Sequence, residues 1–183
     1  MTKFFVIRGT QSAGKTTTCW LVYRYLSAMA DEGKLQTIFI GDEWKEIPSA
    51  MPPFCYDRGE GLGLAYMDFK AIVPFQGKRI GIISAGDFVD WFKSDVEDFL
   101  QREVDYIVCC NRSYNKTNST FNLFETDYAP HYPSEVFWVE WADDASQMMT
   151  AKQKTAVRIV ERIMHDILNP APDAAIDQPA QND

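Results

Sequence analysis

The chain has 183 residues, of which 46% are hydrophobic and 24% are charged, and its formal net charge is -8. This length predicts a single domain, residues 1–168, with enough apolar surface to bury an independent core. The acidic charge argues against a nucleic-acid partner, because phosphate backbones attract basic proteins. Near the N-terminus, the apolar run Phe4–Ile7 is too short for a signal peptide or a membrane span. We therefore expect a cytoplasmic protein that does not contact membranes.

The cysteines do not show the spacing of a metal or redox motif. Cys109 and Cys110 are adjacent, and no two of the four cysteines have C-x-x-C spacing. We expect all four to be reduced, mostly buried thiols. The two histidines are too few and too widely separated in the sequence to suggest a zinc site.

The first half of the chain is expected to contain two buried strands that flank a helix. Residues 4–7 and residues 36–40 are short apolar runs bounded by polar or turn residues, which is typical of buried strands. Between them, apolar residues at helical spacing predict a helix over residues 15–30. Residues 44–67 contain three prolines and three glycines, so we expect an irregular connection of a length that is usually functional.

The second half is expected to begin with a β-hairpin, because Gln76-Gly77 separates two strand-like runs, 68–75 and 78–84. The last helix is expected to begin after Asp144, which forms a capping box with Gln147. The other expected elements are, in chain order, a helix at 88–102, a strand at 106–110, a polar loop at 113–120, a strand at 136–141, a helix at 145–168, and a disordered tail containing Pro and Asp at 169–183.

The alternation of strands and helices predicts an α/β fold. Parallel strands joined by helices form a sheet that is covered on both faces, so we expect three layers in the order α/β/α. The sheet is expected to be mostly parallel, with one antiparallel strand contributed by the hairpin.

The segment between the first strand and the first helix matches the phosphate-loop pattern G-x-x-x-x-G-K-[ST] at every position. Glycines let such a loop curl so that its N–H groups face phosphate oxygens, and the next helix adds the positive end of its dipole. Lys15 is expected to hold the β- and γ-phosphates, and the Thr16 hydroxyl is expected to bind Mg²⁺. The expected nucleotide-binding residues are Gly9, Thr10, Gln11, Ser12, Ala13, Gly14, Lys15, Thr16 and Thr17.

With this motif, the chain resembles the P-loop NTPases, in their Walker A sequence and in their order of strands and helices. Residues 80–87 and 107–113, with a helix between them, are also similar to small P-loop ATPases of unassigned activity that are related to nucleoside and nucleotide kinases. The resemblance implies a P-loop NTPase fold, bound ATP and Mg²⁺, and a catalytic role for Lys15. ATP is the expected nucleotide, because Asn115-Lys116 does not continue into the guanine-specific pattern N-K-x-D.

Two acidic positions follow expected strands. P-loop proteins usually carry an acid, which orders the water shell of Mg²⁺, at the end of a strand beside the P-loop strand. Asp87 is our candidate for that metal site, although an Asp directly before a helix is also a favoured N-cap. Asp42, with Glu43 as a second choice, is our candidate for the catalytic base of a kinase, although a solvated pair at a strand end is also common.

An arginine usually stabilises the transferring phosphoryl group. Arg112 is the best candidate, because it follows the strand at 106–110 and ligands of α/β sheets bind at the carboxyl ends of parallel strands. Arg58 lies in a glycine-rich segment that could close over a substrate, and Lys116 lies in the polar loop. For each of these cations, the alternative is an ordinary surface charge.

Two classes of function fit these residues. The first is a kinase that transfers phosphate from Mg-ATP to a small-molecule acceptor held near Asp42 and residues 44–67. The second is a regulatory ATPase that hydrolyses slowly and acts through a protein partner, as the run Thr16-Thr17-Thr18 would suggest. A kinase acting on nucleic-acid ends is the weakest candidate because of the acidic charge. The sequence predicts neither the acceptor nor the oligomeric state.

Overall fold

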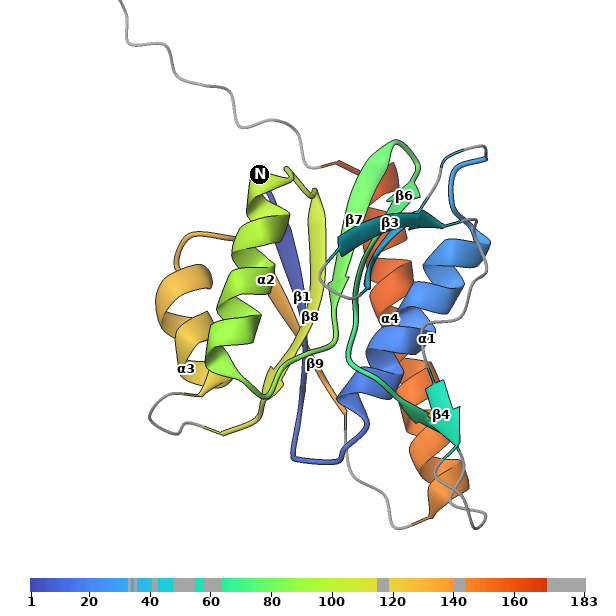
Figure 1. Ribbon diagram of the computed structural model, residues 1–183, viewed down its shortest axis with the longest axis vertical. Helices are drawn as coiled ribbons and strands as arrows, with labels where there is room; N and C mark the ends of the chain where they lie inside the picture. Colours follow the sequence, from blue (N-terminus) through green and yellow to red (C-terminus); the bar gives the residue numbers. More distant parts are fainter. Residues whose placement is uncertain are drawn as a thin grey trace, which may run out of the picture.

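The computed structural model shows an α/β fold built on a mixed seven-stranded sheet (Figure 1). The strands lie in the order β3-β2-β6-β7-β8-β1-β9, and β4 and β5 form a separate two-stranded sheet. The structure describes residues 1–32, 34, 36–40, 43–47, 55–57, 64–114, 119–139 and 144–170.

The bounds of the elements mostly follow the predicted ones. The strands are β1 (Lys3–Gly9), β2 (Gln36–Ile40), β3 (Glu43–Ile47), β4 (Cys55–Asp57), β5 (Leu64–Tyr66), β6 (Lys70–Phe75), β7 (Lys78–Ile83), β8 (Tyr106–Arg112) and β9 (Ser134–Trp138). The helices are α1 (Lys15–Ala28), α2 (Val89–Gln101), α3 (Thr120–Leu123), the π-helix η1 (Phe124–Tyr128) and α4 (Ala145–Leu168). Within the described residues, no helix combines the length and apolar character that a membrane span requires.

The prediction of a mostly parallel sheet with one antiparallel strand is wrong. β1 pairs with β8 and β9 in parallel, and β7 pairs with β8 in parallel. The pairs β6–β7, β2–β6 and β2–β3 are antiparallel. Both β6 and β3 therefore run against the other strands. β6 is the antiparallel strand that the hairpin predicted. β3 is a second one, because the chain turns back on β2 where we expected an irregular segment.

Three local predictions also need correction. β3, β4 and β5 lie within residues 44–67 or at their edge, where we expected no regular structure. α3 and η1 follow the polar loop and were not predicted, since their apolar residues are few and closely spaced. β9 ends at Trp138, three residues before the predicted end. The hairpin at Gln76-Gly77 is confirmed, with φ values of 52° and 71°.

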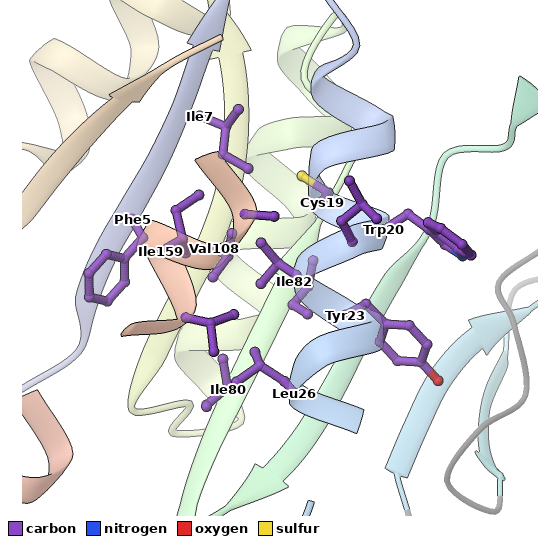
Figure 2. Packing of buried hydrophobic residues seen from close by; sticks show 14 of the residues in the cluster. Phe5, Ile7, Cys19, Trp20, Tyr23, Leu26, Ile80, Ile82, Val108 and Ile159 are labelled. Atoms are coloured by element: carbon purple, nitrogen blue, oxygen red, sulfur yellow. The ribbon is translucent and has the colours of Figure 1, made fainter. Parts of the chain in front are cut away.

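Two helices cover one face of the sheet, where α1 and α4 pack against the strands (Figure 1). Figure 2 shows this core, in which Leu26 of α1, Ile159 of α4 and Ile82 of β7 belong to one buried cluster. Alternate residues of β1 point to opposite faces, so Phe5 enters this core and Phe4 enters the other. The helices α2, α3 and η1 cover that second face, so the predicted three layers are confirmed.

The strand register brings residues that are distant in sequence to one edge of the sheet. Gly9, the last residue of β1, is paired with Arg112, the last residue of β8. Lys70, the first residue of β6, is paired with Ile83, the last residue of the antiparallel β7. The start of β6 and the ends of β1, β7 and β8 therefore share the edge where α1 begins.

We expect Phe99→Ala to lower the free energy of unfolding by about 3–5 kcal/mol, because it leaves a cavity under α2. Phe99 is fully buried and its ring lies 5.9 Å from that of Trp44. Urea denaturation measures the change. The matched control is Trp91→Ala on the same helix, which should change stability by less than about 0.5 kcal/mol because Trp91 is 61% exposed. Equal losses in the two variants would contradict this packing.

Candidate functional site

The loop between β1 and α1 is a tight turn with two residues at positive φ. Gly14 is the N-cap of α1 and has a left-handed conformation with φ 88°, and Ser12 also has a positive φ of 61°. The Ala13 N–H donates to the Thr10 carbonyl (3.3 Å), which closes a tight turn. The loop thus leads directly into the positive end of the α1 dipole.

Both glycines of the motif are packed closely by other elements. A Cβ atom on Gly9 would lie 2.9 Å from the carbonyl oxygen of Val139 and 3.1 Å from the Cβ of Ala13. A Cβ atom on Gly14 would lie 2.0 Å from Cε of Lys152 and 2.6 Å from its Nζ. The loop therefore needs glycine at Gly9 because a Cβ atom would meet backbone. At Gly14 the left-handed backbone requires glycine, since the flexible end of Lys152 could move away from a side chain.

The Lys15 side chain folds back over the loop. Its Nζ donates to the carbonyl oxygens of Gly9 (3.3 Å) and Thr10 (3.0 Å), and the residue is only 7% exposed. Gln11 is exposed and Thr17 half-buried. A phosphate group in the loop would meet this ammonium group and the free N–H groups at the start of α1. The residues present thus fit a polyphosphate.

Asp68 is part of the site, although the sequence analysis did not single it out. Thr16 Oγ1 donates to Asp68 Oδ1 (3.0 Å), and Ser84 Oγ donates to the same oxygen (3.3 Å). Asp68 is exposed as a residue, but its carboxyl reaches the buried Ser84, and desolvation raises its pKa. The two hydrogen bonds and the charge of Lys15 act in the opposite direction.

The predicted hairpin contained a signal for Asp68. An acid at the start of the first strand of a hairpin lies opposite the end of the second strand. Asp68 precedes β6, and Ser84 follows β7, so the two residues meet at the edge of the sheet. Because Asp87 also follows β7, the hairpin brings a second carboxylate close enough to raise the pKa of Asp68.

The structure brings together Asp87 and Arg112. Arg112 Nε donates to Asp87 Oδ1 (3.2 Å), and Arg112 Nη1 donates to the Tyr114 hydroxyl (2.9 Å). The N-cap of α2 is Phe88, with no side-chain cap bond, so the capping alternative for Asp87 is wrong. β7, the strand that Asp87 follows, is not beside β1 as we expected, because β8 lies between them.

The structure describes one of the other candidate residues, Glu43. Asp42, Arg58 and Lys116 lie outside the described residues. Glu43 begins β3 at the far edge of the sheet, and the strands β2, β6, β7 and β8 separate it from β1. Its exposed carboxylate lies 3.8 Å from Lys45 Nζ, which agrees with a solvated ion pair. Glu43 is therefore remote from the phosphate loop.

Lys152 on α4 is the second residue that sequence reasoning missed. Its ammonium group lies against Gly14 of the phosphate loop, since a Cβ atom on Gly14 would be 2.6 Å from Lys152 Nζ. In the sequence, Lys152 is far from the motif. The residue is half-buried. It adds a second cation near the N-terminus of α1, which only the packing of α4 on α1 creates.

A hollow of about 400 Å³ is lined in part by Asp68, the residue that accepts the hydrogen bond of Thr16. Its lining comes from the end of β2, the start of β6 and the first turns of α2, namely Phe39, Asp68, Phe69, Lys70, Ala85, Trp91, Ser94 and Asp95. This volume lies in the range of small-molecule sites.

Comparisons of the chain with protein-family models, with curated proteins and with solved structures each found no match. In the part of the chain that the structure describes, no group of three His, Cys, Asp or Glu side chains could hold a metal ion. Three described cysteines, Cys19, Cys109 and Cys110, are buried free thiols, as expected.

We expect Lys152→Ala to weaken the binding of inorganic tripolyphosphate about tenfold, because it removes a cation from the phosphate loop. Isothermal titration calorimetry at fixed ionic strength measures this affinity. Lys154→Ala is the matched control, since it removes the same charge from an exposed position of α4 and should change the affinity less than about twofold. Equal effects of both variants would show that Lys152 acts only through net charge.

Proposed function

We propose that this protein binds Mg-ATP in the loop Gly9–Thr16 and transfers the terminal phosphoryl group to a small-molecule acceptor. One observation carries the proposal: the motif lysine is folded over its own loop while the motif threonine is hydrogen-bonded to a carboxylate, Asp68. A strand–helix turn that resembled the motif by chance would have no need for either contact. A P-loop NTPase fold for the sheet around β1 belongs to the same proposal.

Each residue of the cluster has a part in this proposal. Lys15 and the N–H groups of the loop bind and orient the phosphates. Asp68 accepts a hydrogen bond from the Thr16 hydroxyl, which leaves the oxygen lone pairs of Thr16 available to Mg²⁺. Asp87 provides a second carboxylate near Asp68, and it binds the side chain of Arg112, whose backbone pairs with Gly9. Bound Mg²⁺ would supply charge compensation for the phosphates.

The hollow beside Asp68 favours phosphoryl transfer over a regulatory ATPase. A slow switch needs a surface for its partner, whereas a kinase needs a second small-molecule site within reach of the nucleotide phosphates. Asp68, one of the residues that line the hollow of about 400 Å³, is hydrogen-bonded to Thr16. Turnover that no acceptor accelerates would instead favour the regulatory ATPase.

We expect Lys15→Ala to lower the affinity for Mg-ATP about 10- to 100-fold, because it removes a charged hydrogen-bond donor from the phosphates. Calorimetric titration with Mg-ATP measures the loss. Arg24→Ala is the control, since Arg24 is an exposed cation of the same helix. Unchanged affinity in Lys15→Ala, with the protein folded by circular dichroism, would exclude this loop as the nucleotide site.

We expect Asp68→Asn to raise the Mg²⁺ concentration needed for half-maximal ATP binding about tenfold, because the amide no longer orients Thr16 as a carboxylate does. Asp87→Asn should raise it by a smaller factor, since part of its role is to hold Arg112. Titration with Mg²⁺ at constant ATP measures both. Asp90→Asn, an exposed acid on α2, should leave the requirement unchanged. If Asp68→Asn only lowers the melting temperature, the bond to Thr16 is purely structural.

A further inference from the structure

The hollow next to Asp68 has aromatic side chains in its lining. Phe39 comes from β2 and Trp91 from the first turn of α2, whereas Phe69, directly before β6, is buried with its ring packed on Tyr23. Trp91 is 61% exposed, which is unusual for so large an apolar side chain and leaves the indole available to a ligand. Flat side chains of this kind favour a ligand with a planar ring.

The charges around the hollow make a phosphorylated ligand unfavourable. Lys70 is the cation among the lining residues, and its Nζ is already paired with Asp95 (2.8 Å) and with Asp98 (3.0 Å). Lys70 Nζ also lies 4.1 Å from the centre of the Phe39 ring, with its side chain 9% exposed. A second carboxylate, Asp68, also belongs to the lining. A phosphate group here would meet two carboxylates and one neutralised cation.

The polar groups of the lining suit hydroxyl groups. Ser94 is exposed at the wall and can donate or accept a hydrogen bond. The carboxylates of Asp68 and Asp95 accept hydrogen bonds from hydroxyl groups, and their charge favours a neutral or cationic ligand. The aromatic side chains, the acidic charge and the hydrogen-bonding groups together suit a hydroxylated, unphosphorylated molecule with a flat ring.

We infer that the hollow binds the phosphoryl acceptor, and that this acceptor is an unphosphorylated, neutral or cationic molecule that carries a planar ring and hydroxyl groups. The inference rests on the proposed function and names its substrate class. Nucleosides and hydroxylated pyridines share this chemistry, and both are small enough for a hollow of about 400 Å³.

The reaction that follows is balanced without a further reactant. An acceptor hydroxyl oxygen forms a bond to the terminal phosphorus of ATP, and the bond from that phosphorus to the bridging oxygen of ADP breaks. The electron pair of the broken bond leaves with ADP, and the hydroxyl proton is released to water. The products are ADP and the phosphate ester of the acceptor.

Binding can be measured without turnover, because Trp91 lies in the wall of the hollow. We would titrate the protein with a nucleoside mixture, with pyridoxine and with the nucleoside monophosphates, in the presence of a non-hydrolysable ATP analogue and Mg²⁺. Nucleosides absorb where tryptophan is excited, so calorimetry gives the affinity and tryptophan fluorescence, corrected for that absorbance, supports it. We expect saturable binding of an unphosphorylated ring compound, at least about tenfold tighter than binding of its monophosphate.

Two neighbouring aromatic residues provide a matched pair of variants. Trp91→Ala should weaken acceptor binding about tenfold, because it removes a ring from the wall. Phe88→Ala should change it less than about twofold, since Phe88 is 59% exposed and packs on Trp91 at 4.9 Å without lining the hollow. Ser94→Lys should reduce the ratio between the affinity for the unphosphorylated compound and the affinity for its monophosphate, because it adds a cation to the wall.

The outcomes separate this inference from the proposed function. If Mg-ATP binds in a Lys15-dependent manner but none of the ring compounds binds, or only monophosphates bind, the acceptor inference is overturned and the nucleotide site stands. Equal losses in Trp91→Ala and Phe88→Ala would also overturn it. If Mg-ATP itself does not bind, the proposed function fails, whatever the ring compounds do. If both inferences hold, steady-state assays with ATP show whether nucleosides or hydroxylated pyridines are phosphorylated.

Discussion

The candidate site depends on the pairing of β1 with parallel neighbours on both sides. β8 and β9 hold β1 in the centre of the parallel part of the sheet, and almost every residue of β1 is buried. This pairing fixes where β1 ends, so Gly9 reaches the edge beside Arg112 and the loop begins there. The packing of α1 and α4 on the same face then sets the direction in which α1 leaves the loop.

The antiparallel part of the sheet brings the carboxylate of Asp68 to the phosphate loop. Because β6 runs against β7, its start lies at the edge where the parallel strands end. Asp68 is thereby placed beside Thr16, and the buried Ser84 holds its carboxyl through a second hydrogen bond. The departure from a parallel sheet is therefore the feature that brings a carboxylate, and the hollow next to it, to the phosphate loop.

The electrostatics of the site are local. The chain carries a net charge of -8, yet the loop gathers Lys15 and Lys152 around the N-terminus of α1. Arg112 lies beside Gly9, but Asp87 partly compensates its charge. The neighbouring hollow is acidic, since Asp95 and Asp98 neutralise Lys70. A polyphosphate and an uncharged ring compound would thus find opposite environments side by side, which helps to keep two ligands in their own positions.

The sequence by itself determined the elements whose signals are local. The phosphate-loop motif, the turn at Gln76-Gly77 and the start of α4 at Asp144 each depend on residues within a few positions of one another, and the structure has the expected backbone at each. The pairing of β3 with β2, the bond from Thr16 to Asp68 and the position of Lys152 against Gly14 were decided only by the tertiary structure. These contacts depend on strand order and helix packing, which single-sequence periodicity does not specify, because the same alternating pattern fits either strand direction.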